Sequence, residues 1–537
     1  MTIKLKIVLA QLNLYVGDIN GNLAKLITAA KTARDTHHAD IIVFSELSLT
    51  GYPPEDLLYR KAFIDAAAAS LRQFQQEVRD IYCVVGHPLV IKHKLYNACS
   101  VIYNGEILGC YTKQYLPNYS IFDEYRYFTP GSSPCIVPIK GIPVGITICE
   151  DLWHEEPIKQ AAMQGARLIL APNASPFEIN KHEERTQVLK TRVKETHLPI
   201  VYVNCIGGQD ELVFDGGSMV IDAHENICQH AGFFKETLLP VDFEINENTI
   251  HIPSNPIALP TKDELIYQAL VLGVRDYVHR NHFPGALIGV SGGIDSALVL
   301  AIAVDALGKD NVKAILMPSR YTSDISMEDA MTLIHNINVE HEVISIEPAF
   351  TSFLACLDLN KQPSITEENI QSRCRGTIIM ALSNKTGRIV LTTGNRSEMT
   401  VGYATLYGDM AGGLDVLKDI PKTLVYRLAQ YRNQRHPVIP QRIIDRPPTA
   451  ELAPNQKDED SLPPYPILDK ILALYLNDEK SSEEIIQQGF DAATVLKVVN
   501  LINKSEYKRR QAPIGIRVNH KAFGRDRRYP ITSGFKE

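Results

Sequence analysis

The chain has 537 residues, too many for one ordinary hydrophobic core, so we expect two large domains. Hydrophobic residues make up 45% of the sequence and charged residues 22%, which is typical of a soluble globular protein. A formal net charge of −7 disfavours a general nucleic-acid-binding function. The nine cysteines are scattered without CxxC pairs, and no apolar run approaches a membrane span. We therefore expect a cytoplasmic protein that binds neither nucleic acid nor a membrane.

The first half of the sequence alternates apolar strands with amphipathic helices. Strands are predicted over residues 4–12, 39–47, 105–113 and 141–151, and a helix over residues 22–36. Three chemically capable side chains, those of Glu46, Lys113 and Cys149, lie at or just past the ends of three of these strands. Since strand ends can converge around one pocket, we predict that these three residues form a site.

These residue types suit the cleavage of an amide. A cysteine attacks an amide only after losing its proton, which a carboxylate such as Glu46 can accept and later return to the leaving amine. An ammonium group such as that of Lys113 would favour the thiolate and stabilise the oxyanion of the tetrahedral intermediate. Taken singly, each residue has an ordinary structural explanation, because buried cysteines usually pack and most lysines are solvated.

A break in composition separates the two halves. Prolines are closely spaced in residues 253–260 (PSNPIALP), which is typical of a linker between folded units. We therefore expect a first domain over residues 1–252, a linker over residues 253–262 and a second domain over residues 263–537.

The second half is organised around GVSGGIDS, residues 289–296. A strand is predicted before this loop, over residues 286–290, and a helix after it, over residues 297–308. Glycines let the backbone approach an anion, and the N–H groups and dipole of the helix N-terminus favour negative charge. The loop therefore predicts a phosphate site, although an ordinary strand-to-helix turn is also rich in these residue types. It is not a Walker A motif, because no Gly-Lys-Ser/Thr follows.

Three further strands are predicted over residues 312–318, 341–346 and 388–395. Strands that alternate with helices predict an open parallel sheet, whose ligands bind outside the carboxyl ends of the strands. The last of these strands brings Thr393 and Glu398 to the same edge as the glycine-rich loop. Glu398 is a candidate partner for a metal or ligand, or an ordinary acidic residue in a first helical turn. Asp295 could hold Mg²⁺ against phosphate oxygens.

Family patterns sharpen the prediction for the first half. The segments FSELSLTGYPPEDL, KQYLPNYSIFDEYRYF and ICEDLW carry Glu46, Lys113 and Cys149, and together they resemble the nitrilase superfamily over roughly residues 3 to 250. This resemblance implies a four-layer αββα sandwich and amide hydrolysis through a covalent thioester. It also implies that three residues line the pocket for the amide donor glutamine: Tyr119, Ser175 and Lys181.

The second half resembles ATP pyrophosphatases, which adenylate a substrate and release pyrophosphate, through the loop SGGIDS. With ENIQSRCRG, LTTGNRSEMTVGYATLYGDMAGGLDVLKD, ELAPNQKDEDSLPPY and EYKRRQ, the chain resembles the glutamine-dependent NAD⁺ synthetases over essentially its whole length. The resemblance implies an α/β protein whose second domain is an open, Rossmann-like parallel sheet. It implies that ATP, glutamine and deamido-NAD⁺ are substrates.

Site residues in the second domain follow from the same resemblance. Nine residues would bind ATP: Gly289, Val290, Ser291, Gly292, Gly293, Ile294, Asp295, Ser296 and Thr393. Three would contact deamido-NAD⁺: Asn369, Glu398 and Lys508. The candidates for Mg²⁺ are Asp295 and Glu398. We expect small-molecule substrates and a homo-oligomer, dimer or higher.

The implied chemistry explains why two activities share a chain. A carboxylate does not exchange oxygen for ammonia at useful rates, so ATP would adenylate the nicotinate carboxylate and ammonia would then displace AMP. Ammonia is mostly protonated at neutral pH, and an amidase in the same chain can release it unprotonated and nearby. We hypothesise that ammonia passes between the sites through a protected tunnel.

Two other functions stay open on the residues alone. One is an amidotransferase that adenylates a different acid, such as an aspartate side chain. The other is a nucleotide-binding regulator whose amidase half senses glutamine. No Rossmann GxGxxG motif is present, so a dinucleotide would be substrate and product rather than a bound redox cofactor. Histidines and cysteines show no spacing typical of zinc, which leaves Mg²⁺ as the metal we propose.

Two charged regions have ambiguous roles. Residues 447–465, rich in Pro, Glu and Asp, predict a solvated loop, and the resemblance makes this loop a mobile segment near the synthetase site. A group of basic residues predicts a solvated face or tail, or alternatively a surface for a phosphate-rich ligand. This group comprises the basic residues of EYKRRQ together with Arg517, Lys521, Arg525, Arg527 and Arg528.

Overall fold

The structure is a computed structural model that describes residues 2–255, 257–359, 364–453, 456 and 458–535. The chain forms two compact units, Met1–Pro260 and Thr261–Glu537, each of which has its own sheets and core. Over the described ranges, none of the helices is long and apolar enough to cross a membrane.

Two large sheets form the centre of the first unit. The first sheet has the order β15-β14-β1-β2-β3-β4-β5, and the second has the order β13-β12-β9-β8-β7-β6. Strands of the first sheet are β1 (Ile3–Gln11), β2 (Ile41–Val43), β3 (Tyr82–Ile91), β4 (Lys94–Tyr103), β5 (Glu106–Thr112), β14 (Thr237–Ile245) and β15 (Ile250–His251). Those of the second are β6 (Cys135–Ile139), β7 (Ile142–Ile146), β8 (Leu168–Asn173), β9 (Ile200–Asn204), β12 (Met219–Ile221) and β13 (Ile227–His230). A small hairpin joins β10 (Ile206–Gln209) to β11 (Leu212–Asp215).

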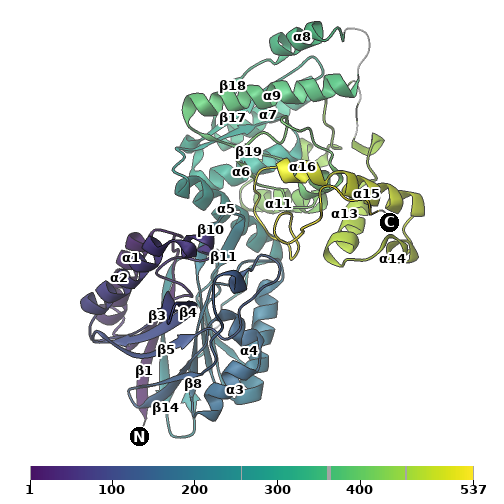
Figure 1. Cartoon of the computed structure of the whole chain (residues 1–537). Helices are drawn as coiled ribbons and strands as arrows, with labels where there is room; N and C mark the ends of the chain where they lie inside the picture. The colour runs from purple at the N-terminus through teal and green to yellow at the C-terminus, as the bar shows by residue number, and fades with distance from the viewer. Residues whose placement is uncertain (1, 256, 360–363, 454–455, 457, 536–537) are drawn as a thin grey trace. The chain divides into compact units, whose positions relative to one another are not determined.

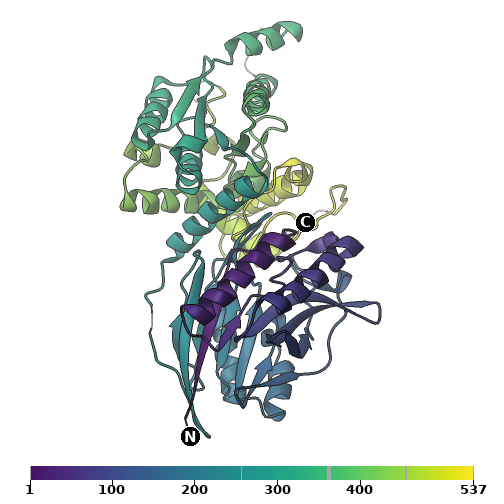
Figure 2. The same cartoon turned by 90° about the vertical axis from the view of Figure 1, so that its left-hand side faces the viewer.

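Helices cover the outer faces of both sheets. The four are α1 (Ile19–Asp35), α2 (Lys61–Glu77), α3 (Glu156–Met163) and α4 (Lys181–Thr196). Alternation along β1 shows the layering: Ile7 and Leu9 pack in the core between the sheets, whereas Val8 packs in a separate cluster with α1 and α2. Helices α3 and α4 pack on the second sheet in the same way. Figures 1 and 2 show the helix pairs flanking the two sheets. The predicted αββα sandwich is confirmed.

The second unit contains one five-stranded parallel sheet in the order β18-β17-β16-β19-β20, so the predicted open parallel sheet is also confirmed. Its strands are β16 (Ala286–Gly289), β17 (Val312–Leu316), β18 (Glu340–Val343), β19 (Ile389–Thr392) and β20 (Leu414–Asp415). Helices before and between these strands are α5 (Lys262–Arg280), α6 (Ile294–Leu307), α7 (Asp324–Ile337), α8 (Glu347–Cys356), α9 (Ile365–Thr386) and α10 (Arg396–Val401). After β20 come α11 (Lys422–Arg435), α12 (Gln441–Asp445), α13 (Tyr465–Leu472), α14 (Ser482–Gln487), α15 (Ala492–Lys504) and α16 (Glu506–Gln511).

The strand order places a topological switch between β16 and β19. The chain moves outward from β16 to β17 and β18, and then returns to the other side of β16 with β19. Ligands of open parallel sheets bind at such a switch, outside the carboxyl ends of the strands. The loops that follow β16 and β19 are the glycine-rich loop and the segment that carries Glu398.

Several predicted strands are shorter in the structure. β2 ends at Val43 rather than residue 47, and β7 ends at Ile146 rather than residue 151. The strands could not have reached the predicted ends in any case, because Leu47 has φ +45° and Cys149 has φ +46°, and neither value fits an extended strand. Strand predictions thus extended into the turns that carry the candidate site residues.

The basic group near the C-terminus is not uniformly solvated. Arg517 is 2% exposed and its Nε donates to Asp526 Oδ2 at 2.7 Å. Arg509 is 5% exposed and pairs with Glu506 at 2.8 Å. Burial of a guanidinium is tolerated when a carboxylate pairs with it. The prediction of a solvated face is therefore wrong for these two arginines. The predicted mobility of residues 447–465 stays a prediction, and residues 454, 455 and 457 lie outside the described ranges.

Candidate active sites of the two units

Glu46 and Lys113 form a buried ion pair in the first unit. Lys113 Nζ donates to Glu46 Oε1 at 2.7 Å, and both side chains are at most 1% exposed. Asn97 Nδ2 donates to the same oxygen at 2.7 Å, and the backbone N–H of Ala174 donates to Glu46 Oε2 at 3.1 Å. Fixed donors on both oxygens hold the carboxylate in one orientation. The structure therefore brings together two of the three residues that follow the predicted strands.

Glu124 is a second carboxylate on the same lysine. Lys113 Nζ donates to Glu124 Oε1 at 2.8 Å, and the hydroxyl of Tyr52 donates to that oxygen at 2.8 Å. Burial raises the pKa of Glu124 to about 7, against the opposing effect of the Lys113 ammonium, and Glu46 raises it further. Sequence reasoning missed Glu124, although it lies in the quoted segment KQYLPNYSIFDEYRYF.

Cys149 lies next to these charges at the start of a short 3₁₀ helix, Cys149–Trp153. Its side chain is buried, and burial raises the pKa of its thiol well above the ordinary value. The Glu46 charge raises this pKa further, whereas Lys113 and the Ala174 N–H lower it. A left-handed φ of +46° is uncommon for a residue other than glycine and often accompanies functional sites. Cys149 therefore rests as a thiol within the field of a carboxylate.

The three residues predicted to bind the amide donor lie on elements around this cluster. The hydroxyl of Tyr119 donates to Glu150 Oε2 at 3.1 Å, beside Cys149. Ser175 is buried, and its Oγ accepts from Arg185 Nε at 3.0 Å. Lys181, the first residue of α4, lies 4.4 Å from the centre of the Trp153 ring. Glu150 directly follows Cys149 in the chain, and sequence reasoning did not single it out.

The glycine-rich loop of the second unit joins β16 to α6. Ser291 Oγ accepts from the Gly293 N–H at 3.2 Å, and Ser296 Oγ accepts from the Ser291 N–H at 3.2 Å. Gly292 has φ +85°, and a Cβ at this position would lie 2.3 Å from the backbone oxygen of Ser326. Because the first N–H groups of a helix lack intrahelical partners, the start of α6 offers donors to an anion.

This loop lines a pocket of about 330 Å³, within the range of small-molecule sites. Residues 289–296, Thr393 and Glu398 all line it, so the structure groups these predicted residues around one cavity. Segment 447–465 contributes Thr449, Glu451 and Asp458 to the same wall. Sequence reasoning had placed that segment near the site through the resemblance alone.

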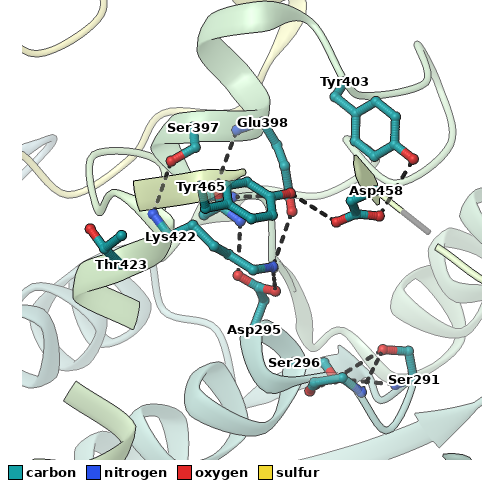
Figure 3. A network of polar contacts seen from close by, with 12 residues as sticks. Ser291, Asp295, Ser296, Ser397, Glu398, Tyr403, Lys422, Thr423, Asp458 and Tyr465 are labelled. Atoms are coloured by element: carbon teal, nitrogen blue, oxygen red, sulfur yellow. Dashed lines mark hydrogen bonds and ion pairs between the residues drawn. The ribbon is translucent and has the colours of Figure 1, made fainter. Parts of the chain in front are cut away.

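A charged network lies at one side of this pocket (Figure 3). Lys422 Nζ donates to Asp295 Oδ2 at 2.5 Å and to Glu398 Oε1 at 3.3 Å. Asn395 Nδ2 donates to Asp295 Oδ1 at 2.9 Å. Burial raises the pKa of Glu398 to about 8, opposed by Lys422 and reinforced by Asp295 and the nearby Asp458. Lys422 was missed from the sequence, because an isolated lysine gives no signal of its partners.

Aromatic residues complete the network. The hydroxyl of Tyr465 donates to Asp458 Oδ2 at 2.8 Å, and the Tyr403 hydroxyl lies 3.5 Å from Asp458 Oδ1. Lys422 Nζ lies 5.3 Å from the centre of the Tyr465 ring, within the range of cation–π attraction. Over the described ranges, no group of three or more His, Cys, Asp or Glu side chains is arranged to hold a metal ion by itself.

Asn369 and Lys508, unlike the other predicted site residues of the second unit, do not line the pocket. Asn369 Oδ1 accepts from the Thr405 hydroxyl at 2.8 Å. Lys508 Nζ donates to the carbonyl oxygens of Gly402 and Ala404, each at 2.7 Å. Both residues therefore contact one segment, residues 402–405, whose Tyr403 and Ala404 do line the pocket.

The fold and the two sites define an α/β protein that joins a carbon–nitrogen hydrolase unit to an NAD synthase unit. Residues 6–247 match the carbon-nitrogen hydrolase family model, and residues 266–512 match the NAD synthase model. The chain is 47% identical to the glutamine-dependent NAD(+) synthetase of Xylella fastidiosa (strain 9a5c), and the alignment covers 99% of each chain. It is 45% identical to the enzyme of the same name from Thermotoga maritima, again over 99% of each.

A solved structure shows the same likeness. The glutamine-dependent NAD+ synthetase from Acinetobacter baumannii, in complex with adenosine diphosphate, is 43% identical and superposes with a TM-score of 0.81 over 98% of each chain. The chain belongs to the family of glutamine-dependent NAD(+) synthetases. It is an enzyme of the ligase class.

Proposed function

We propose that the chain makes NAD⁺ from deamido-NAD⁺, ATP and glutamine and releases glutamate, AMP and pyrophosphate as the other products. Residues 1–252 would hydrolyse glutamine and residues 263–537 would activate and amidate deamido-NAD⁺, with residues 253–262 as a linker. Full-length similarity to the enzymes from Xylella and Thermotoga supports the reaction, and the two sites described above support its division into steps. A cytoplasmic homo-oligomer stays our prediction for the assembled enzyme.

The first step begins with proton removal from Cys149. Because the pKa of this thiol is raised, the resting thiol needs a base within its own pocket. Glu46 can accept the proton, since three donors fix its position and its charge already acts on the thiol. The thiolate then attacks the glutamine amide, and Glu46 returns the proton to the leaving ammonia.

Lys113 stabilises the charge that forms during this attack. The Lys113 ammonium is fixed by two carboxylates, so its position costs no reorganisation when the oxyanion of the tetrahedral intermediate forms. Loss of ammonia leaves a thioester on Cys149, and water then hydrolyses it with Glu46 again as the base. Tyr119, Ser175 and Lys181 would line the pocket for the glutamine substrate.

The second step needs an activated carboxylate, because oxide is a poor leaving group. The nicotinate carboxylate of deamido-NAD⁺ attacks the α-phosphorus of ATP and pyrophosphate leaves. Ammonia then displaces AMP from the adenylate. Donors at the start of α6 face the phosphate region, and Lys422 adds a buried ammonium there. Thr393 lies at the end of β19 in the same pocket, while Asn369, Glu398 and Lys508 would hold deamido-NAD⁺ near residues 402–405.

The acidic residues at this pocket fit Mg²⁺. Proteins hold this ion with one or two carboxylates, while waters and substrate phosphates complete its octahedral shell. Asp295 and Glu398 share one ammonium, so their oxygens already converge on a single cation. When bound, Mg²⁺ would neutralise phosphate charge. The residues of the chain that would hold it are Asp295 and Glu398.

The observation that carries this proposal is the coexistence of a buried Glu46–Lys113 pair beside Cys149 and a phosphate-type loop beside Lys422 in one chain. Product analysis tests it: the purified protein is given ATP and deamido-NAD⁺ with either glutamine or ammonium, and NAD⁺, AMP and pyrophosphate are measured. We expect all three with both donors. Release of pyrophosphate with another acid, such as aspartate, but not with deamido-NAD⁺ would overturn the substrate assignment.

Transfer of ammonia between the sites has its own test. Labelled free ammonium is supplied during glutamine turnover, and the label in NAD⁺ is measured. Direct passage predicts little label in the product, whereas complete exchange would rule out a protected route.

A further inference from the structure

Helix α11 begins without a cap from its own chain segment. Pro421 occupies the position before the first residue, Lys422, and offers no side-chain hydrogen bond to the helix. The first N–H groups of an α-helix have no intrahelical carbonyl partners, so they need acceptors from elsewhere. In α11 these acceptors come from two other helices, α10 and α13. Helix α13 packs against both α10 and α11.

Asp469 of α13 supplies one of the two acceptors. Its Oδ2 accepts from the backbone N–H of Thr423 at 2.9 Å and from the Thr423 hydroxyl at 2.7 Å. Its Oδ1 accepts from the hydroxyl of Ser397 in α10. One carboxylate thus ties α13 to the first turn of α11 and to α10. A negative charge at a helix N-terminus is also favoured by the helix dipole.

The chain of hydrogen bonds continues to Lys422. Ser397 Oγ, which donates to Asp469, accepts from the backbone N–H of Lys422 at 2.9 Å, as Figure 3 shows. The backbone of Lys422 is therefore fixed on one side by Ser397 and, through Thr423, on the other side by Asp469. Its side chain is 2% exposed and reaches the two carboxylates at the phosphate end of the pocket, Asp295 and Glu398.

Tyr465 is a second residue of α13 that contacts the charged network around Lys422. It lies four residues before Asp469, so the two side chains project from one face of the helix. Its hydroxyl donates to Asp458, and its ring lies beside Lys422 Nζ. Helix α13 therefore contacts the Lys422 side chain through Tyr465, and through Asp469 it binds Thr423, the next residue of α11, and Ser397, which accepts from the Lys422 N–H.

We propose that Asp469 is a positioning residue for the ATP-dependent step. It fixes the start of α11 against α10, and this holds the Lys422 ammonium where the phosphates of ATP bind. The inference rests on the proposed function in one respect, which is the role of Lys422 towards ATP. Misplacement of a fixed charge by about 1 Å can cost on the order of 100-fold in rate. An ordinary helix cap would instead affect stability without singling out ATP.

The test compares three variants in the full-length protein. Asp469→Ala removes both acceptors, Asp469→Asn keeps one acceptor oxygen, and Lys470→Ala is the control on the exposed side of the same helix. We expect kcat/KM for ATP in ammonia-dependent synthesis to fall about 10- to 100-fold in Asp469→Ala and less in Asp469→Asn. Lys470→Ala should match the wild type. Hydrolysis of glutamine, measured alone, should be unchanged in all three.

A double-mutant cycle distinguishes positioning from a structural role. ATP affinity is measured by calorimetry, without turnover, for wild type, Asp469→Ala, Lys422→Met and the double variant, and thermal unfolding is recorded for each. If Asp469 acts through Lys422, adding Asp469→Ala to Lys422→Met causes no further loss of ATP affinity. Independent, multiplicative losses would overturn the proposal, as would wild-type ATP use by a folded Asp469→Ala variant. If Asp469→Ala does not fold, the same cycle is run with Asp469→Asn.

The two proposals fail in distinguishable ways. If the wild type binds ATP but forms no NAD⁺ from deamido-NAD⁺ and ammonia, the proposed function is wrong, and the affinity cycle still decides on Asp469. If the wild type makes NAD⁺ and the cycle is additive, the proposed function stands and the positioning role is wrong.

Discussion

Each unit contains a buried lysine whose ammonium lies between two carboxylates. The lysines are Lys113 in the first unit and Lys422 in the second, and each is at most 2% exposed. Their partners are Glu46 and Glu124 in the first unit and Asp295 and Glu398 in the second. Desolvation raises the pKa of one carboxyl in each group, to about 7 for Glu124 and about 8 for Glu398, because one ammonium compensates two neighbouring carboxylates only in part.

The surroundings of the two lysines differ. In the first unit the remaining donors to Glu46 come from Asn97 and the Ala174 N–H, and the neighbour is a buried thiol. In the second unit Lys422 faces a pocket of about 330 Å³. The same arrangement of charges therefore suits proton transfer where it is enclosed and the binding of phosphate where it borders a cavity.

The largest expected effect separates the two units. Cys149→Ala removes the proposed nucleophile, so we expect glutamine-dependent synthesis to fall on the order of 10,000-fold or more. Ammonia-dependent synthesis should stay near the wild-type rate, because the second unit keeps every residue of its pocket. Steady-state NAD⁺ formation with each donor measures the difference. Loss of both activities in a folded variant would show that Cys149 does more than hydrolyse the amide.

Removal of Lys422 should have the opposite selectivity. Lys422→Met leaves two carboxylates without their ammonium, and we expect synthesis to fall about 100- to 1,000-fold with either nitrogen donor. Hydrolysis of glutamine should persist. The variant should also lose about 3–5 kcal/mol of stability in the second unit, because a buried pair is broken from one side. Thermal unfolding and separate assays of the two reactions check this, and an equal loss of both reactions would contradict it.

The raised pKa of Glu124 predicts a pH dependence in the first unit. Its carboxyl becomes ionised as the pH rises through about 7, the value to which burial raises its pKa. Once ionised, Glu124 also pairs with the Lys113 ammonium. Lys113 then neutralises less of the Glu46 charge, so Glu46 attracts the thiol proton more strongly. We therefore expect glutamine hydrolysis to weaken as the pH falls below 7.

Glu124→Gln provides the comparison, since an amide does not ionise and keeps an acceptor oxygen for Lys113 and Tyr52. In this variant, kcat/KM for glutamine should no longer fall as the pH is lowered below 7. The sign also applies to stability: a carboxyl whose pKa is raised from 4.5 on folding stabilises the fold at low pH and loses that contribution as the pH rises through 7. If kcat/KM of Glu124→Gln still falls below pH 7, another group causes the pH dependence.

The smallest predicted effect concerns Tyr119, beside the first site. The Tyr119 hydroxyl donates to Glu150, and the residue is 49% exposed, which weakens the contribution of this bond. We expect Tyr119→Phe to raise KM for glutamine about three- to ten-fold with little change in kcat. Tyr125→Phe is a matched control, because Tyr125 is 57% exposed. Equal KM values for the two variants would remove Tyr119 from the proposed glutamine site.

The fold could be predicted from periodicity and family resemblance, and the site could be predicted only in part. Alternating strands and helices predicted the open parallel sheet of the second unit, whereas the αββα sandwich of the first unit followed from the family resemblance. The strand ends placed Glu46 and Lys113 close enough to pair. Glu124 lies only 11 residues from Lys113, but the spacing along a loop does not show that the two side chains meet. Lys422 escaped prediction because its partner lies far away in sequence. For Lys422 the partner Asp295 is 127 residues away, and nothing in local spacing reports such a contact.

The boundaries failed for a different physical reason. Hydrophobic runs continued past the last residues of β2 and β7, Val43 and Ile146, into turns in which Leu47 and Cys149 have positive φ values. Backbone conformations of this kind are imposed by tertiary packing, so apolar periodicity does not reveal them.

The internal hydrogen bonds of the glycine-rich loop have a consequence for the thermodynamics of ATP binding. Ser291 and Ser296 already hold the loop in its turn, and Gly292 already lies against Ser326. A loop that is ordered before its ligand arrives loses little conformational entropy on association, so more of the contact energy is expressed as affinity. Ser296→Ala should therefore weaken ATP binding chiefly through a less favourable entropy, which calorimetry measures directly.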